Sequence, residues 1–170
     1  MAGSNLYVAV PEQASVVAIE AVYRQRFHRF VQVAEAVCGD PGLARDAVQD
    51  AFAAAIRTRS EFRGEARLES WLWGCVLNAA RKTRRDRLEG LTGVDEERAA
   101  TNGHAVESSS LRQALAGLPE RQRQVLFLRH FADLDYASIA QALAISTGTV
   151  GATLNQAHAA LRRLLEETSL

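Results

Sequence analysis

Residues 136–150 read YASIAQALAISTGTV, and this stretch has the spacing of two short helices joined by a tight turn. Ser146 stands where the second helix would begin, and serine is a favoured cap at a helix start. Ala140 is small, as needed where two helices cross closely. Five apolar residues at helical spacing predict a small core: Ile139, Leu143, Ile145, Val150 and Leu154. The stretch predicts a helix-turn-helix whose second helix enters the major groove of DNA, with another kind of helical hairpin as the alternative.

The rest of the chain also has helical spacing, and no segment gives a strong strand pattern. Apolar residues recur at intervals of three and four from Val16 to Val37, and again after Pro41. Asp40 can cap the second of these helices, because Pro41 then takes the first helical position, where its missing N–H costs nothing. Further helices are predicted at 68–87, at 111–118 and from Pro119 to about Phe131. We therefore expect an all-α protein.

Charge and composition divide the chain into parts. Residues 1–88 carry 13 basic and 10 acidic side chains, residues 89–110 carry one arginine and five acids, and residues 111–170 carry six basic and five acidic side chains. The middle part is rich in glycine, serine and acids, which leaves too little apolar surface to offset the entropy of ordering it. We predict two small helical domains, 16–88 and 111–170, joined by a flexible acidic linker at 89–110 and preceded by a disordered segment at 1–15.

Several protein classes are disfavoured by composition. Apolar residues make up 48% of the chain, yet no apolar run approaches the roughly 18 residues of a membrane span. No secretory signal is evident, so we expect a cytoplasmic protein without membrane insertion. Cys38 and Cys75 lie far apart within helical patterns, which favours small buried residues over a disulfide or metal site. The sequence offers no nucleophile–base set, phosphate loop or metal cluster. We expect no catalytic residue, no metal, no cofactor and no enzyme.

Two tryptophans precede the densest basic cluster of the chain. Trp71 and Trp73 lie on the helix predicted at 68–87, and the cluster RKTRRDR occupies residues 81–87 of the same helix. Flat aromatic faces beside positive charge suit unstacked bases and their phosphates. Tryptophans on a helix are also common core residues, and the residues alone leave both interpretations open.

Two sets of motifs, in order along the chain, resemble the extracytoplasmic-function (ECF) sigma factors of bacterial RNA polymerase, in the sigma-70 family. The first set is similar to their domain two: Asp40-Pro41, DAVQDAF at 46–52, FRGE at 62–65, SWLW at 70–73 and Asn78. The second set is similar to their domain four: LPERQR at 118–123, Leu128-Arg129, YASIA at 136–140 and STGTV at 146–150. The resemblance runs from about Val22 to Leu165. It implies a sigma factor that binds core RNA polymerase and directs promoter-specific initiation.

The resemblance also implies roles for single residues. Docking on the clamp helices of the largest polymerase subunit is expected from Asp46, Gln49, Asp50 and Phe52. Recognition and melting of the minus-ten element, with a flipped base, is expected from Phe62, Arg63, Gly64, Trp71, Trp73, Asn78, Arg81, Lys82, Arg84 and Arg85. Contact with the minus-thirty-five element is expected from Arg121, Arg123, Ser146, Thr147, Thr149, Gly151, Thr153, Asn155 and Gln156. The polymerase flap, promoter DNA and an anti-sigma factor complete the expected partners.

The chain departs from the family pattern in the second helix of the helix-turn-helix. Gly151 and Thr153 stand where the family usually has a basic residue and an arginine, so we expect weak minus-thirty-five binding or an altered preference. In domain two, Leu77 replaces a frequent arginine and Lys82 a common acid. Two other functions stay open: a sigma-like adaptor without full promoter competence, and a stand-alone helix-turn-helix regulator that binds operators without polymerase.

Overall fold

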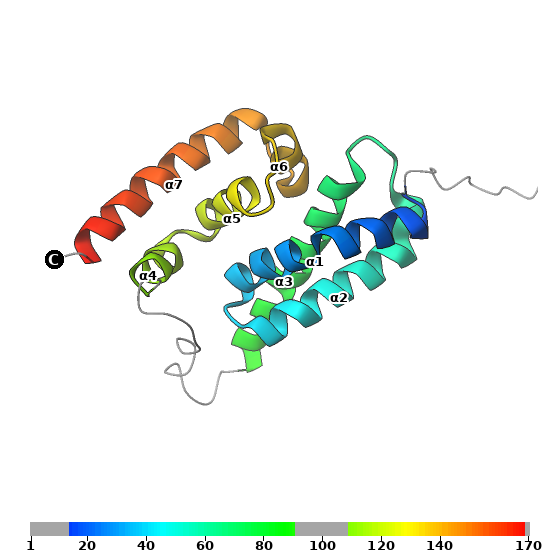
Figure 1. Cartoon of the computed structure of the whole chain (residues 1–170), viewed down its shortest axis with the longest axis horizontal. Helices are drawn as coiled ribbons and strands as arrows, with labels where there is room; N and C mark the ends of the chain where they lie inside the picture. Colours follow the sequence, from blue (N-terminus) through cyan, green and yellow to red (C-terminus); the bar gives the residue numbers. More distant parts are fainter. Residues whose placement is uncertain (1–13, 91–108, 169–170) are drawn as a thin grey trace, which may run out of the picture.

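The structure, a computed structural model, describes residues 14–90 and 109–168, and these residues form helices and no strand (Figure 1). The elements are α1 (Val16–Cys38), α2 (Pro41–Thr58), the 3-10 helix η2 (Arg59–Glu61), α3 (Leu68–Gly90), α4 (Ser109–Gly117), α5 (Glu120–His130), α6 (Tyr136–Leu143) and α7 (Thr147–Thr168). The all-α prediction is confirmed. The predicted disordered start and acidic linker fall mostly on residues outside the described ranges.

Local sequence signals define the helix ends. The carboxylate of Asp40 accepts a hydrogen bond from the Leu43 N–H at 2.8 Å, and Pro41 is the first residue of α2, as predicted. Gly39 ends α1 with φ 75°, a left-handed conformation that glycine adopts without strain. Ser146 Oγ accepts a hydrogen bond from the Thr149 N–H at 3.1 Å and caps α7, which confirms the second predicted cap.

Helices α1, α2 and α3 pack on one another and form an N-terminal unit with an aromatic core. The Trp73 ring lies 4.1 Å, centroid to centroid, from the Phe30 ring, and Phe30 meets the Phe52 ring edge-on at 5.1 Å. Trp73 and Phe30 are fully buried and Phe52 nearly so. Such aromatic pairs bury large apolar areas, so they account for much of the stability of this unit.

Helices α4 to α7 form a C-terminal unit, in which α7 packs along α4, α5 and α6. Four of the five predicted core residues of the helix-turn-helix are buried, and Ile145, in the turn, is half-buried. Within the described ranges no single helix is long and apolar enough to cross a membrane. Only α6 and α7 taken together reach that length and composition, and they are bent by 99°.

The two units pack against each other, which the sequence did not predict. Helix α5 lies beside α1, and α6 lies beside α3 (Figure 1). At the closest approach, a Cβ built on Gly74 of α3 would lie 3.3 Å from the carbonyl oxygen of Ala142 in α6. A glycine inside a helix costs about 1 kcal/mol relative to alanine, and here its missing side chain lets two backbones approach. The apolar core is continuous across both units.

Candidate nucleic-acid interface

The loop between η2 and α3 carries the first of the predicted DNA-contacting residues. Phe62 is 4% exposed, and its ring lies 5.3 Å from that of Trp71, which is half-buried. The expected open contact from Phe62 is therefore not available in this conformation, because the ring fixes the loop to α3. Arg63 and Gly64 are exposed, and Gly64 has φ 73°, a backbone conformation that side-chain-bearing residues rarely adopt. Together, Arg63, Gly64 and the partly open Trp71 ring form the accessible part of the loop.

Trp73 does not lie on this surface. Its exposed fraction is 0%, and it packs on Phe30 within the N-terminal unit. The expectation that Trp73 offers its face to a base is wrong for this structure, and the core interpretation holds for this residue. Residues two apart on a helix are about 200° apart around its axis, so Trp73 lies inside the three-helix core while Trp71 packs at its edge and stays partly exposed.

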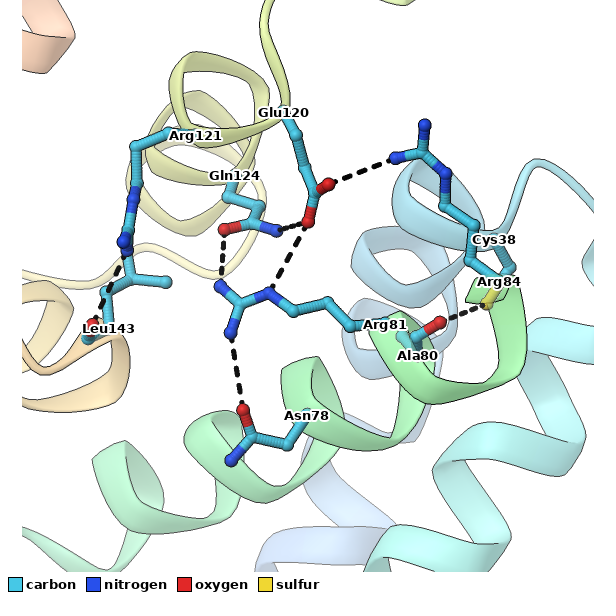
Figure 2. Close-up of polar contacts among 9 residues, drawn as sticks. All are labelled: Cys38, Asn78, Ala80, Arg81, Arg84, Glu120, Arg121, Gln124 and Leu143. Carbon is cyan, nitrogen blue, oxygen red and sulfur yellow. Dashed lines mark hydrogen bonds and ion pairs between the residues drawn. The ribbon is translucent and has the colours of Figure 1, made fainter. Parts of the chain in front are cut away.

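The basic half of α3 presents its polar side chains in two ways. Asn78, Lys82 and Arg85 are exposed, whereas Arg81 and Arg84 are half-buried beneath α5. Figure 2 shows Asn78 and Arg81 one turn apart on α3, where Arg81 Nη1 donates to Asn78 Oδ1 at 3.3 Å. The spacing places Asn78, Arg81 and Arg85 on one face of the helix. This face can meet a phosphate backbone with its cations and a base edge with its amide.

Two residues of α5 occupy that basic face (Figure 2). Glu120 pairs with both arginines: its Oε1 lies 3.4 Å from Arg81 Nε in an ion pair, and its Oε2 accepts a hydrogen bond from Arg84 Nη1 at 3.2 Å. Gln124, which is 2% exposed, accepts from Arg81 Nη2 through Oε1 at 2.6 Å and donates through Nε2 to Glu120 Oε1 at 2.6 Å. We call these four residues the interdomain polar cluster. The sequence interpretation missed Glu120 and Gln124 as functional residues, since no local pattern indicates a partner about 40 positions away.

The predicted polymerase-docking residues on α2 separate into two kinds. Asp46, Gln49 and Asp50 are exposed, so they remain available to a basic partner. Phe52 is 5% exposed and meets the rings of Phe30 and Tyr23. A direct contact from Phe52 to a partner is therefore inconsistent with the structure, and Phe52 instead holds α2 on the core.

The second helix of the helix-turn-helix, α7, presents an uncharged surface at its start. Ser146, Thr147, Thr149, Asn155 and Gln156 are exposed, and Gly151 is half-buried beside Tyr136. Thr153 is 9% exposed, so the predicted contact of Thr153 with a base is wrong for this structure. No lysine, arginine, aspartate or glutamate occurs from Ser146 to Leu161. This surface can read base edges with hydroxyls and amides, yet it supplies no fixed charge for phosphates.

The two arginines predicted to anchor the upstream DNA backbone make contacts inside the C-terminal unit. Arg121 Nη1 donates to the carbonyl oxygen of Leu143 at 3.4 Å, and Arg123 Nη1 donates to that of Ala116 at 3.0 Å. Burial lowers the pKa of the Arg123 guanidinium from its usual high value. Arg121 is exposed and remains accessible to phosphate. Arg123 is half-buried, and its hydrogen bond to Ala116 holds the end of α4 near α5.

The two cysteines and His130 also have shifted pKa values. Cys38 and Cys75 are free, and burial, the main cause, raises the pKa of each thiol to about 11, so both are protonated near neutral pH. His130 of α5 and His158 of α7 bring their Nε2 atoms within 3.2 Å. Partial burial, the neighbouring His158 and then Arg129 lower the pKa of His130.

Family models match both helical units. "Sigma-70 region 2" matches residues 22–88, and "Sigma-70, region 4" matches residues 108–165. The RNA polymerase sigma factor YlaC of Bacillus subtilis is 30% identical over 156 residues, which cover 85% of this chain and 90% of YlaC. The ECF RNA polymerase sigma factor SigM of Mycobacterium tuberculosis is 30% identical over 146 residues, covering 84% of this chain and 73% of SigM.

Two solved structures share the fold. CnrH, in complex with the cytosolic domain of CnrY, superposes with a TM-score of 0.69 at 22% identity over 93% of this chain and 95% of its own. The sigma factor RpoE of Bartonella quintana, in complex with the anti-sigma factor NepR, gives a TM-score of 0.73 at 21% identity over 89% of this chain and 98% of its own. With α1–α3 matched by region 2 and α4–α7 by region 4, the chain belongs to the ECF sigma factors of the sigma-70 family, which direct RNA polymerase to promoters.

Proposed function

We propose that this sigma factor binds core polymerase through α2, opens the minus-ten element with the loop after η2 and the basic half of α3, and contacts upstream duplex with the first turns of α7. One observation supports the proposal above others. Helix α3 continues from the half-buried Trp71 to the face of Asn78, Arg81 and Arg85, so an aromatic ring, an amide and cations follow one another along a single rigid element. Proteins that bind single-stranded DNA combine aromatic rings that stack on bases with cations that contact the backbone.

Base capture has a plausible energy balance on this surface. Extracting a base from the duplex costs a few kcal/mol, and stacking on an aromatic ring returns roughly 1–3 kcal/mol per base. Gly64 allows the backbone to come close to a flipped base, and the Asn78 amide can pair with a base edge. Lys82 and Arg85 are exposed, Arg85 in a surface ion pair with Glu89 at 3.9 Å, and both can reach phosphates, which adds affinity without reading sequence.

Polymerase docking is assigned to the acidic face of α2. Asp46 and Asp50 are four residues apart and exposed, and they form acceptors for arginines or lysines of a partner. The double variant Asp46→Ala/Asp50→Ala is expected to lose most of its affinity for core polymerase, measured by size-exclusion chromatography or fluorescence anisotropy. Glu20→Ala, which removes an exposed acid of α1 paired only with its neighbour Arg24, is the matched control. Equal affinity of both variants would remove α2 from the interface.

The uncharged start of α7 favours weak upstream recognition. With no basic side chain from Ser146 to Leu161 and Thr153 buried, the isolated contact with a minus-thirty-five duplex lacks the counterion-release contribution that dominates affinity in most DNA-binding proteins. We propose that promoter choice rests mainly on the minus-ten element. Tight, salt-steep binding of duplex by the free chain would contradict this assignment.

An anti-sigma protein is the further partner that we propose. Two solved structures that share this fold contain a bound partner: CnrH with the cytosolic domain of CnrY, and RpoE with the anti-sigma factor NepR. A protein that binds this chain is expected to compete with core polymerase for α2 or for α3. A binding competition between the two, monitored with labelled sigma factor, tests this expectation.

Run-off transcription separates this function from its alternatives. Purified chain is added to core polymerase with DNA from upstream of its own gene as template. Promoter-specific product supports the proposed function. Polymerase binding without product supports a sigma-like adaptor, and binding to the same duplex without polymerase supports a stand-alone regulator. Failure to bind core polymerase at all would overturn the proposal.

A further inference from the structure

The DNA-facing arginines of α3 already have an anionic partner within the chain. Glu120 of α5 places one carboxylate oxygen on Arg81 and the other on Arg84, and Gln124 completes the hydrogen bonds of Arg81 (Figure 2). A carboxylate bridging two guanidinium groups is the same kind of acceptor as a phosphate of a nucleic-acid backbone. The two anions therefore compete for the same donors.

The contact is not confined to this cluster. Three turns toward the start of α3, Gly74 faces the backbone of Ala142 in α6, and near its first residue Arg67 lies 3.7 Å from Asp135 at the start of α6. The Gly74 contact is steric and independent of charge. Region 4 thus contacts α3 at several points between its beginning and Arg84, beside the side chains with which region 2 is assigned to hold separated DNA.

We propose that region 4 inhibits region 2 in the free sigma factor, with Glu120 taking the position of a promoter phosphate on Arg81 and Arg84. The proposal rests on the proposed function, since it concerns the same face of α3. DNA binding by region 2 requires α5 and α6 to leave α3. Polymerase, which holds the two regions at separate promoter elements, supplies that separation.

The strength of the contact suits a reversible device. The side chains of Arg81, Arg84 and Glu120 are 35%, 39% and 40% exposed, so water and salt screen their attraction. Gly74 adds close packing, and the apolar core that continues across both units adds an attraction that salt does not screen. Such a contact keeps the two regions of the free chain together, which we call the closed form. It breaks when a partner binds the open form, with the regions apart, more tightly than the closed form.

Two variants open the chain by different means. Gly74→Leu places a side chain where the backbone of Ala142 lies, and it alters no charge and no residue assigned to DNA. Leucine is also a better helix former than glycine, so α3 itself is not weakened. Glu120→Arg replaces the bridging carboxylate with a third cation and repels α5 from α3. The matched control is Glu167→Arg, which makes the same charge change on the exposed end of α7, where Glu167 pairs with Arg163.

The test measures shape and DNA binding on the same full-length proteins. Small-angle X-ray scattering gives the separation of the two regions without DNA, and fluorescence anisotropy gives affinity for a labelled mixed-sequence single-stranded DNA. Both opening variants are expected to be more extended than wild type. They are expected to bind the DNA about tenfold more tightly, since closure reduces the apparent affinity of wild type to the intrinsic affinity multiplied by the fraction of open molecules. Glu167→Arg is expected to keep the wild-type shape and to bind no more than about twofold more tightly, from its added charge alone.

A charge exchange identifies the cluster itself. Adding Arg84→Glu to Glu120→Arg restores an ion pair of opposite sense, so this double variant is expected to return to the compact shape while its DNA affinity stays low. An extended double variant would overturn the role of the Glu120–Arg84 pair.

The outcomes separate this inference from the proposed function. An extended wild-type chain, or open variants that bind single-stranded DNA no more tightly than the control, overturns the inhibition even if transcription succeeds. Failure of wild type and both open variants to bind core polymerase overturns the proposed function, whereas the scattering result still decides whether the chain is closed.

Discussion

Helices α3 and α7 are both assigned to DNA, and they present opposite surfaces. Helix α3 carries five cations between Arg81 and Arg87, whereas α7 has no charged side chain up to Leu161 apart from the titratable His158. Two of the cations of α3, Arg81 and Arg84, are partly covered by Glu120 and Gln124 of α5, and the start of α7 is open. Helix α3, which has the cations that attract DNA, is therefore partly covered, and helix α7, whose start is exposed, has no cation there to attract it.

The difference between the two helices separates affinity for the DNA backbone from recognition of bases. Phosphate contacts by cations give salt-dependent, sequence-independent affinity, and hydroxyls or amides discriminate bases with little dependence on salt. We propose that the cations of region 2 supply most of the phosphate contacts, beside its reading of the minus-ten element, and that the start of α7 in region 4 contributes base contacts without charge. We therefore expect a free molecule with this arrangement to bind DNA weakly, and to use its specificity only after polymerase brings the two helices to separate elements.

The largest expected effect tests what supports α3. Trp73→Ala removes the ring that packs on Phe30 and is expected to lower the free energy of unfolding by about 3–5 kcal/mol. Val17→Ala, at a side chain 76% exposed, is the control and is expected to change it by less than about 0.5 kcal/mol. Chemical denaturation followed by circular dichroism measures both. A loss below about 1 kcal/mol for Trp73→Ala would show that α3 does not depend on this ring.

The second prediction divides reading from affinity directly. Asn155→Ala or Gln156→Ala is expected to cost about 1–3 kcal/mol against the preferred upstream base and to leave the salt slope unchanged. Arg85→Ala in α3 is expected to weaken binding to all sequences alike. It should also reduce the salt slope, the slope of the logarithm of the binding constant against the logarithm of the salt concentration, by about one. Salt titrations of the polymerase complex on promoter variants measure both quantities. A salt slope that falls for Asn155→Ala as it does for Arg85→Ala would abolish the distinction between the helices.

A third, smaller effect compares a glycine in each helix. Gly151→Ala is expected to stabilise region 4 by up to about 1 kcal/mol, because the added Cβ would lie 3.5 Å from Tyr136 Cε2, an ordinary contact. Gly74→Ala brings the same helical preference, but its Cβ would lie 3.3 Å from the Ala142 carbonyl oxygen and crowd α6. Thermal unfolding is expected to show the larger gain for Gly151→Ala. Equal gains would mean that α3 and α6 separate readily.

The smallest effect concerns pH and lies in region 4 alone. The pKa of His130 is lowered in the folded chain from 6.5, so the unfolded chain takes up this proton first. Stability is therefore expected to fall as the pH drops below about 6.5, towards the lower folded pKa. His130→Gln should reduce the difference in melting temperature between about pH 7.5 and about pH 5.5, and Glu167→Gln should not. An unchanged pH dependence in His130→Gln would assign the effect to another group.

Helix ends and the order of helices could be predicted from the sequence, because their signals are local. Asp40-Pro41 and Ser146 cap helices within three residues of themselves. The burial of Trp73 and Thr153 was harder to foresee, since α3 and α7 are covered on more than one side and a single apolar stripe underestimates what is inside. The pairing of Glu120 with Arg81 and Arg84 had no local signal. Glutamate early in a helix also stabilises the helix dipole, which is sufficient reason for its presence.

The shared carboxylate of Glu120 has a consequence for engineered hybrids. A chimaeric sigma factor that joins these first three helices to the last four of another member keeps or loses this acid according to the donor. Hybrids with a neutral residue at that position should bind DNA of any sequence without polymerase. Hybrids with an acid there should not bind DNA until polymerase is added. Compatibility between the halves would then depend on one side chain, rather than on how well each half recognises its own promoter element.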